Sequence, residues 1–269
     1  MIYVATVHFG SPRWIDPQLA YLRRNISEPL LVFASLEDVA GNHEDKYDRV
    51  VPSAGPHAGK LNLLAAEICA VATDNDIIVF LDGDAFPIAD PMPTVRRALE
   101  TTTLVAVRRD ENHGDRQPHP CFCAVRVADW RRLHGDWSAG HCWTSADGGA
   151  VTDVGGNLLR ALELASDEWT PLLRSNRLDL HPLWFGIYGE VVYHHGAGFR
   201  AALSRVDLAE APRASSLGRS LPLAGPVLRR LDTRRRQRFW ETTAARAADL
   251  QEEMFRNLLN DPQFFRKLL

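Results

Sequence analysis

One segment, about a third of the way along the chain, constrains the fold more than any other. Residues 77–82, IIVFLD, form an unbroken apolar run that closes on an acidic residue, and Gly83 and Asp84 follow directly. A run without polar alternation is typical of a strand that is covered on both faces of its sheet. The sequence therefore predicts a buried central strand that presents Asp82 and Asp84 where it ends.

Strand-like and helix-like segments alternate on both sides of this run. Alternation of this kind is typical of an α/β protein, in which helices sandwich a mixed, mainly parallel sheet. We expect this architecture over roughly residues 1–200. The strand-like segments are 3–9, 30–36, 48–52, 77–82, 103–109, 121–127, 178–185 and 190–195, and the helical ones are 17–25, 60–73, 91–100 and the later part of 152–165.

Composition excludes several classes of protein. With 269 residues, of which 45% are hydrophobic, the chain is long enough to fold around one large core without a disulfide or metal. A net charge of −3 argues against a general nucleic-acid-binding protein. No apolar run reaches the roughly 18 residues of a membrane-spanning helix, and the N-terminus does not resemble a signal peptide. Four cysteines without a CxxC pair favour reduced thiols, and we expect a cytoplasmic protein.

The C-terminal segment differs in charge from the rest. Residues 226–269 contain ten Lys and Arg against six Asp and Glu, a net charge of +4, which leaves residues 1–225 at −7. We therefore expect a domain over 1–225 and a basic, amphipathic helical tail over 226–269. Three interpretations of the tail stay open: a helix packed on the protein's own surface, a contact in a homodimer or with another partner, and peripheral attachment to an anionic membrane.

The two carboxylates after the central strand have the chemistry of a metal site. Asp82 and Asp84 can both turn toward one hard cation, and Mg²⁺ and Mn²⁺ prefer oxygen ligands while keeping positions open for water or phosphate. Gly83 between them leaves room for a phosphate to approach. Ligands of open α/β sheets collect beyond the carboxyl ends of the strands, where this pair is expected. The alternative is a surface turn that merely closes the strand.

This D-x-D motif behind a buried strand resembles that of the GT-A family of nucleotide-sugar glycosyltransferases, over roughly residues 1–200. In that family the motif binds a divalent metal that bridges the diphosphate of the donor. The resemblance therefore implies Asp82 and Asp84 as ligands and Mn²⁺ or Mg²⁺ as cofactor. Members of the family often place a basic residue on the preceding helix near the donor, and the matching positions are Lys60 and Asn62.

A later histidine motif extends the resemblance. Residues 194–198, HHGAG, resemble the H-x-x-G segment that supplies a further metal ligand in glycogenin and several other members. Neighbouring side chains of a strand point to opposite faces, so one of the two histidines is expected to bind. We favour His195; the alternatives are His194 and that neither histidine is a ligand. Gly198 would allow close approach to a diphosphate, and Arg200 would reach a phosphate or form a surface salt bridge.

The segment 152–159, TDVGGNLL, resembles the family's D-Q-G-x-L-N-like segment beside the donor sugar. The resemblance implies that Asp153 holds sugar hydroxyls or lies near the reacting carbon. Val154 replaces the polar residue that often follows. The competing role for Asp153 is to cap the next helix. Asp147 is the second candidate for a catalytic base.

Three further residues are candidates for substrate contacts. Thr6 and His8 point the same way along the first predicted strand, whose end holds the base and ribose of the nucleotide in this fold; core packing is the alternative. His119 and the polar loop before it would line the acceptor site, unless that histidine simply faces solvent.

The predicted function is metal-dependent transfer of a sugar from a nucleotide-diphosphate sugar to an unidentified acceptor. Two alternatives stay open: a sugar nucleotidyltransferase and a catalytically silent scaffold of the same fold. Neither GxxxxGK[ST] nor GxGxxG occurs, which disfavours P-loop kinases and Rossmann dehydrogenases.

Overall fold

The computed structural model describes residues 1–112, 114–145, 148–196, 198, 206–207 and 225–269. The chain divides into two compact units. One consists of Met1–Phe199 together with Phe265–Leu269, and the other of Arg200–Phe264. The organisation into residues 1–225 and a tail over 226–269 stays a prediction.

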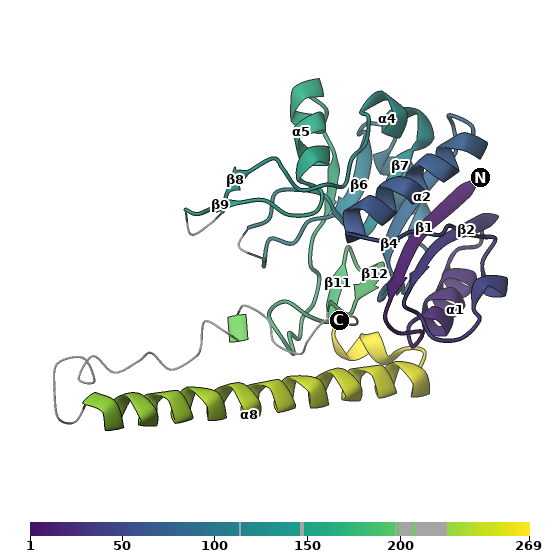
Figure 1. The fold of residues 1–269 in the computed structure, drawn as a ribbon. Coiled ribbons are helices and arrows are strands. Elements are labelled where there is room, and N and C mark those ends of the chain that lie inside the picture. The colour runs from purple at the N-terminus through teal and green to yellow at the C-terminus, as the bar shows by residue number, and fades with distance from the viewer. Residues whose placement is uncertain (113, 146–147, 197, 199–205, 208–224) are drawn as a thin grey trace. The chain divides into compact units, whose positions relative to one another are not determined.

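A seven-stranded sheet forms the centre of the first unit, in the order β10-β6-β7-β4-β1-β2-β3 (Figure 1). All of its strands run parallel except β7, which is antiparallel to both of its neighbours. The expectation of a mixed, mainly parallel sheet is confirmed. The strands are β1 (Ile2–Phe9), β2 (Leu30–Glu37), β3 (Arg49–Val50), β4 (Ile77–Asp82), β6 (Leu104–Val107), β7 (His119–Arg126) and β10 (Thr170–Leu172).

Helices cover both faces of this sheet, as the unbroken apolar strands predict. Alternate residues of β1 divide between the two faces, with Ala5 in the core beside α2 and α5 and Thr6 on the side of α1. The α-helices of the first unit are α1 (Ile15–Asn25), α2 (His57–Val71), α3 (Met92–Ala98), α4 (Val127–Arg132) and α5 (Gly156–Ala165), and Glu44–Lys46 form a short 3₁₀ turn.

A small antiparallel sheet, β11-β12-β5, continues from the end of β4. Its strands are β5 (Ala85–Pro87), β11 (Gly186–Tyr188) and β12 (Val192–His194), and a separate hairpin pairs β8 (Trp143–Thr144) with β9 (Ala150–Val151). The predicted strand over 178–185 is wrong. The guanidinium of Arg174 donates hydrogen bonds to the carbonyls of His181, Pro182 and Trp184. These carbonyl oxygens therefore accept from a side chain instead of from a neighbouring strand.

The second unit contains the long helix α8 (Gly225–Asn260), so the predicted tail is helical. Met254, Phe255 and Leu258 are buried, whereas Leu259 is exposed. In the described part of the chain, no helix combines the length and hydropathy needed to cross a membrane.

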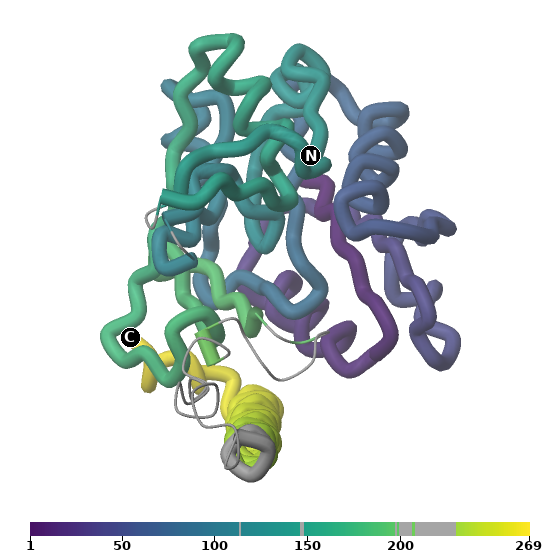
Figure 2. The backbone as a smooth tube through the Cα atoms, turned by 60° about the vertical axis from the view of Figure 1, so that its left-hand side comes forward, coloured from purple at the N-terminus to yellow at the C-terminus, as the bar shows by residue number. Residues whose placement is uncertain are grey.

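The last residues return to the first unit after the turn Phe264–Lys267. The carbonyl of Leu268 accepts hydrogen bonds from the backbone N–H groups of Arg177 (2.8 Å) and Leu178 (3.2 Å). Figure 2 shows this yellow C-terminal segment beside the green loop that precedes β11.

Candidate active site

The two carboxylates of the D-x-D motif lie where the large sheet passes into the small one. Asp82 is the last residue of β4, and Asp84 occupies the turn before β5. β4 lies between β1 and β7 in the middle of the sheet, so this turn opens at the carboxyl end of the central parallel strands. That edge is where α/β sheets bind ligands.

His194 completes a cluster with the two acids. β12 pairs with β5 so that His194 stands opposite Ala85. Its Nε2 lies 3.6 Å from Asp82 Oδ2 and 3.5 Å from Asp84 Oδ1. One ligand atom from each of the three residues lies within 4.8 Å of the others. Two carboxylate oxygens and an imidazole nitrogen at this spacing fit a divalent cation such as Mn²⁺ or Mg²⁺. We refer to Asp82, Asp84 and His194 as the acidic centre.

His195 does not join the acidic centre. Its ring lies among Trp14, Phe185 and Tyr193, and its Nδ1 is 3.1 Å from the hydroxyl of Tyr193. The two histidines face opposite sides because they are consecutive residues in extended backbone. The sequence analysis favoured His195 as the ligand, whereas the structure brings the alternative, His194, to the carboxylates.

Backbone N–H groups hold the carboxylate of Asp84 in place. Its Oδ2 accepts hydrogen bonds from the N–H of Gly196 (3.1 Å) and of Gly198 (2.9 Å). A Cβ at Gly198 would lie 2.6 Å from Cβ of Asp84, so only glycine fits there. Gly198, expected near a diphosphate, therefore positions a candidate metal ligand. Burial by itself would raise the pKa of Asp84, but His194, His195 and the N–H of Gly198 lower it well below its usual range.

The surroundings of His194 shift its pKa, and a cation that binds to its Nε2 would displace the proton held there. Burial alone would lower the pKa of this imidazole, but the neighbouring Cys121 thiol and Asp84 carboxylate raise it well above its usual value. Burial raises the pKa of the Cys121 thiol in turn, and His194 and Arg109 oppose that rise. All four cysteines of the chain are free thiols.

His57 is a site residue that the sequence analysis missed. It is the first residue of α2, and its Nε2 lies 2.9 Å from Asp82 Oδ1, on the side of that carboxylate away from His194. Its side chain is 37% exposed, which leaves it open to an incoming ligand. Its position one helical turn before Lys60 was the sequence signal that could have identified it. The predicted helix began after this histidine, so the signal was not used.

Gln18 is the second missed residue, and it braces the D-x-D turn from α1. Its Nε2 donates to the carbonyls of Asp82 and Ala85, both at 2.8 Å, so one amide group holds both ends of the turn. Its Oε1 accepts from Thr6 Oγ1 at 2.9 Å and lies 3.1 Å from His8 Nε2. The side chain is fully buried. A buried glutamine on the apolar face of a predicted helix was the available signal.

Thr6 and His8 do point the same way along β1, but toward Gln18 in the interior. Both residues have no exposed surface. Burial lowers the pKa of His8 to about 4, so its ring is neutral at neutral pH. The nucleotide contact expected of these two side chains is not available in this arrangement, and the alternative, core packing, describes them.

Lys60 and Asn62 both lie on α2 but differ in surroundings. Lys60 is 4% exposed, forms an ion pair with Glu37, and lies 5.0 Å from the ring centroid of Phe9. It therefore stands at the carboxyl ends of β1 and β2. Asn62 instead joins two loops, because its Nδ2 donates to Asp136 (2.6 Å) and its Oδ1 accepts from the N–H of Trp137 (2.8 Å). Both ends of its amide are occupied within the protein.

A mostly buried arginine links the acidic residues of the neighbouring loops. Arg109 lies 3.3 Å from Asp115 and 3.6 Å from Asp153. Asp153 is 46% exposed, and its carboxylate accepts from the N–H of Val154. Its alternative role as a helix cap is wrong, because α5 begins after Gly155 and no side chain caps it.

Of the remaining predicted residues, the structure describes His119 and Gly83. His119 is buried at the start of β7, with its ring 5.8 Å from that of His194, so it lies beside the acidic centre rather than in solvent. Gly83 is buried in the D-x-D turn. Asp147 and Arg200 lie outside the described residues.

No protein-family model matches the chain, and no curated protein matches its sequence. Similar solved structures include a mannosyltransferase from Pyrobaculum calidifontis in complex with GDP-Man and Mn²⁺, with 12% identity and a TM-score of 0.41 over 98% of this chain and 84% of that one. The galactosyltransferase LgtC, in complex with donor and acceptor sugar analogues, has 10% identity and a TM-score of 0.36 over 63% and 73%. TarS of S. aureus has 11% identity and a TM-score of 0.38 over 51% of this chain and 30% of its own length.

These structures are those of glycosyltransferases, and the likeness to them is distant. It concerns the arrangement of sheet and helices, and at these TM-scores it carries no conclusion about donor, acceptor or metal. The matched region spans less than a third of TarS. The chemistry of this chain therefore has to be argued from the acidic centre and the residues around it.

Proposed function

We propose that this protein is a metal-dependent glycosyltransferase of the GT-A type, which moves a sugar from a nucleotide-diphosphate sugar to an acceptor. The observation that carries the proposal is the acidic centre, where Asp82, Asp84 and His194 place three ligand atoms within 4.8 Å at the carboxyl end of β4. The D-x-D motif and its place in the order of strands support the same conclusion.

The acidic centre fits a cation better than it fits any other ligand. Within the described residues, neither Asp82 nor Asp84 forms an ion pair with a lysine or arginine, and the backbone N–H of Gly198 favours the ionised form of Asp84. A bound Mn²⁺ or Mg²⁺ would neutralise the negative charge that develops on the departing diphosphate. Open coordination positions are left for phosphate oxygens, because the protein supplies three ligands and Mg²⁺ takes about six.

The surrounding residues of this chain have separate roles in the proposal. His57 orients Asp82 by a hydrogen bond, and Gln18 fixes the turn that carries both acids. Lys60, beside Phe9 at the ends of β1 and β2, would face the nucleotide end of the donor after exchanging its ion pair with Glu37.

Asp153 is the candidate for contact with the transferred sugar. This half-exposed carboxylate lies 3.6 Å from Arg109. It would bind sugar hydroxyls, or accept the proton of the acceptor hydroxyl as that oxygen bonds to the anomeric carbon and the bond to the diphosphate breaks. Asp147 and Arg200, as a second base and a phosphate contact, belong to the same proposal.

We expect the reaction in the cytoplasm, with homodimer or peripheral membrane contact of the tail as open alternatives.

A thermal-shift panel tests the proposal. UDP-, GDP-, dTDP- and CMP-sugars are added with and without Mn²⁺ to the wild type, to Asp84→Asn, and to Asp74→Asn as a matched surface control. Ligand at about 100 times its Kd should raise Tm by roughly 5 °C or more, only with Mn²⁺ and for one nucleotide class. The rise should vanish in Asp84→Asn and persist in Asp74→Asn.

Two outcomes would contradict this function. A panel without any shift would favour the catalytically silent scaffold. A Mn²⁺-dependent shift that survives Asp84→Asn would place the metal outside the acidic centre. Release of the nucleoside diphosphate from the stabilising nucleotide-sugar, in the presence of Mn²⁺ and a mixture of acceptors, then identifies a transferase. A nucleotidyltransferase would instead need added pyrophosphate and would convert the nucleotide-sugar to a nucleoside triphosphate and a sugar phosphate.

A further inference from the structure

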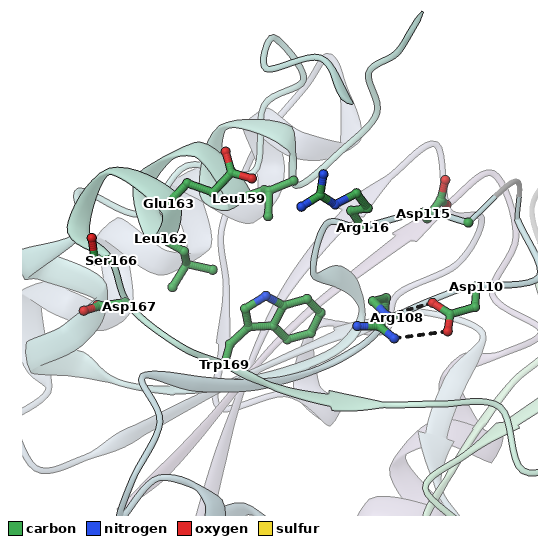
Figure 3. Close-up of a pocket in the computed structure, with 11 residues that line it drawn as sticks. Arg108, Asp110, Asp115, Arg116, Leu159, Leu162, Glu163, Ser166, Asp167 and Trp169 are labelled. Atoms are coloured by element: carbon green, nitrogen blue, oxygen red, sulfur yellow. Dashed lines mark hydrogen bonds and ion pairs between the residues drawn. The ribbon is translucent and has the colours of Figure 1, made fainter. Parts of the chain in front are cut away.

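A second concave site lies beside α5 in the first unit, with a cavity volume of about 430 Å³. That volume falls in the ordinary range of small-molecule pockets, roughly 300–1,000 Å³. Figure 3 shows its apolar and charged side chains gathered from α5, from the loop after β6 and from the segment before β10. We call it the α5 pocket. Its lining residues are Arg108, Asp110, Gly114, Asp115, Arg116, Leu159, Leu162, Glu163, Ser166, Asp167 and Trp169.

The α5 pocket has an apolar floor. Leu159 and Leu162 point from α5 toward the indole of Trp169, which stands on the opposite side (Figure 3). The two leucines are buried, and the indole is partly exposed where it packs against the core. An indole ring offers a large rigid apolar surface together with one N–H donor.

The rim of the α5 pocket is charged, but most of its charges are already paired. Arg108 forms a two-pronged pair with Asp110, at 2.7 and 3.1 Å. Glu163 is 2.9 Å from the Nε2 of His141, and Asp167 is 2.6 Å from Arg132. Within the described part of the chain, the exposed guanidinium of Arg116 has neither a hydrogen bond nor an ion pair.

The charge balance gives an anionic ligand no net attraction. Two arginines and four acidic residues line the pocket, a formal net charge of −2. Arg109 and Arg132 pair with two of these acids, Asp115 and Asp167, which brings the charge of the pocket and its partners to about zero. The donor diphosphate belongs at the acidic centre. A ligand that is neutral, apolar on one face and hydroxylated at its edge fits both the indole floor and the paired polar rim. A saccharide ring has these properties.

The α5 pocket is connected to the acidic residues near the candidate active site. Asp115 lines the pocket and pairs with Arg109, and Arg109 also pairs with Asp153. Two ion pairs that share Arg109 therefore connect the pocket to Asp153, the carboxylate that we propose to contact the transferred sugar.

We infer that the α5 pocket binds a neutral saccharide unit of an extended acceptor, apart from the position of transfer. Trp169 supplies the stacking surface and Arg116 donates hydrogen bonds to the hydroxyls. That the saccharide belongs to an acceptor rests on the proposed function. Binding of a neutral saccharide to this pocket needs neither metal nor donor.

Ligand-observed NMR tests the inference on the full-length protein. The probes are methyl glycosides of glucose, galactose, mannose and N-acetylglucosamine, with maltotriose and cellotriose, and spermidine as a cationic probe. The variants are Trp169→Leu, Arg116→Ala and the site variant Asp84→Asn. Saturation transfer to at least one saccharide is expected in the wild type, with binding weakened about tenfold in Trp169→Leu and about threefold in Arg116→Ala.

The variants keep the test falsifiable even if one of them folds poorly. Arg116 is exposed, so Arg116→Ala should fold like the wild type, and Trp169→Phe restores an aromatic ring and should recover part of the binding. Saccharide binding unchanged in Trp169→Leu and Arg116→Ala, binding of spermidine alone, or no binding of any saccharide would each overturn the inference.

The same variants separate this inference from the proposed function. Asp84→Asn should bind the saccharide as the wild type does, and Arg116→Ala should retain the Mn²⁺-dependent donor shift. Donor binding without saccharide binding would refute the α5 pocket alone. Saccharide binding without donor binding would refute the proposed transferase and leave the pocket as a saccharide site.

Discussion

The acidic centre and the α5 pocket hold their charged groups in opposite ways. In the centre, two carboxylates face each other and an imidazole, and backbone N–H groups and the amide of Gln18 fix their positions. In the α5 pocket, carboxylates are paired with arginines or a histidine around an apolar floor. The first arrangement leaves surplus negative charge for a cation. The second leaves almost none, and it suits a neutral ligand.

The surplus negative charge of the acidic centre needs other groups to hold it in place. Like charges at close range destabilise a fold unless other groups hold them. Asp84 therefore depends on two N–H donors and on Gly198, where a Cβ would collide with Trp14 Nε1 and with the side chain of Asp84. The rim charges of the α5 pocket are each paired with a charge of opposite sign or exposed, so they need no such backbone support.

The largest expected effect comes from removing the brace behind the acidic centre. Gln18→Leu leaves the carbonyls of Asp82 and Ala85 and the hydroxyl of Thr6 without their buried partner. We expect the free energy of unfolding to fall by about 3–5 kcal/mol, since each such group costs about 1–3 kcal/mol. Urea denaturation followed by circular dichroism measures this.

Gln18→Glu is the informative companion, since its shape is conserved but it cannot donate to both carbonyls. It should lose Mn²⁺ affinity together with stability. Wild-type stability in Gln18→Leu would mean that the turn holds itself and that the glutamine is dispensable.

The next effect distinguishes the two adjacent histidines. His194→Ala removes a ligand atom from the acidic centre, and Mn²⁺ affinity should fall roughly 10–100-fold, as measured by electron paramagnetic resonance of free Mn²⁺. His195→Ala removes a ring packed against Trp14 and Phe185. It should lower the free energy of unfolding while leaving Mn²⁺ affinity within about threefold of the wild type. The reverse ranking would restore His195 as the ligand.

The smallest effect concerns pH. His8 is buried and its pKa is lowered by burial to about 4, against a pKa of about 6.5 in the unfolded chain. Between these values the unfolded state binds a proton that the folded state does not, so stability falls as the pH drops below about 6.5. The free energy of unfolding should be about 1 kcal/mol lower at pH 5.5 than at pH 7 on this account.

Two variants isolate the contribution of His8. His8→Asn keeps a polar group near Gln18 without titrating in this range, and it should flatten this part of the pH profile. His134→Asn is the control, because His134 is exposed in a left-handed conformation (φ 49°) that asparagine tolerates. An unchanged pH profile in His8→Asn would assign the effect to another group.

Local patterns were sufficient for much of the fold. The run 77–82 is a strand with those bounds. The alternation of strand-like and helix-like segments around it predicted the mainly parallel sheet that the structure has. The strands over 30–36 and 121–127 and the helix over 17–25 lie within one or two residues of those observed. The short strands β5, β8, β9 and β10 were not predicted, since two or three residues carry too little periodicity to be recognised.

The candidate site was only partly accessible from the sequence. Asp82 and Asp84 were identified because a strand end and a glycine stand next to them in the chain. His57 and Gln18 were missed because their roles depend on partners 25 and 64 residues away in the sequence. Asn62 was assigned to the donor because it shares a helix with Lys60, but helix position does not reveal that Asp136 and Trp137 occupy both ends of its amide.

The sequence by itself determined the strand that ends in two carboxylates, and with it the α/β class and the expectation of a cation at that edge. A buried apolar run and a neighbouring acidic pair are local properties, so no tertiary contact is needed to recognise them. Only the tertiary structure decided that His194 and not His195 meets the acids, because the pairing of β12 with β5 sets which face of the strand turns inward. It alone also showed that Gln18 holds the turn and that Trp169 and Arg116 share a pocket, since these contacts join segments that the chain keeps far apart.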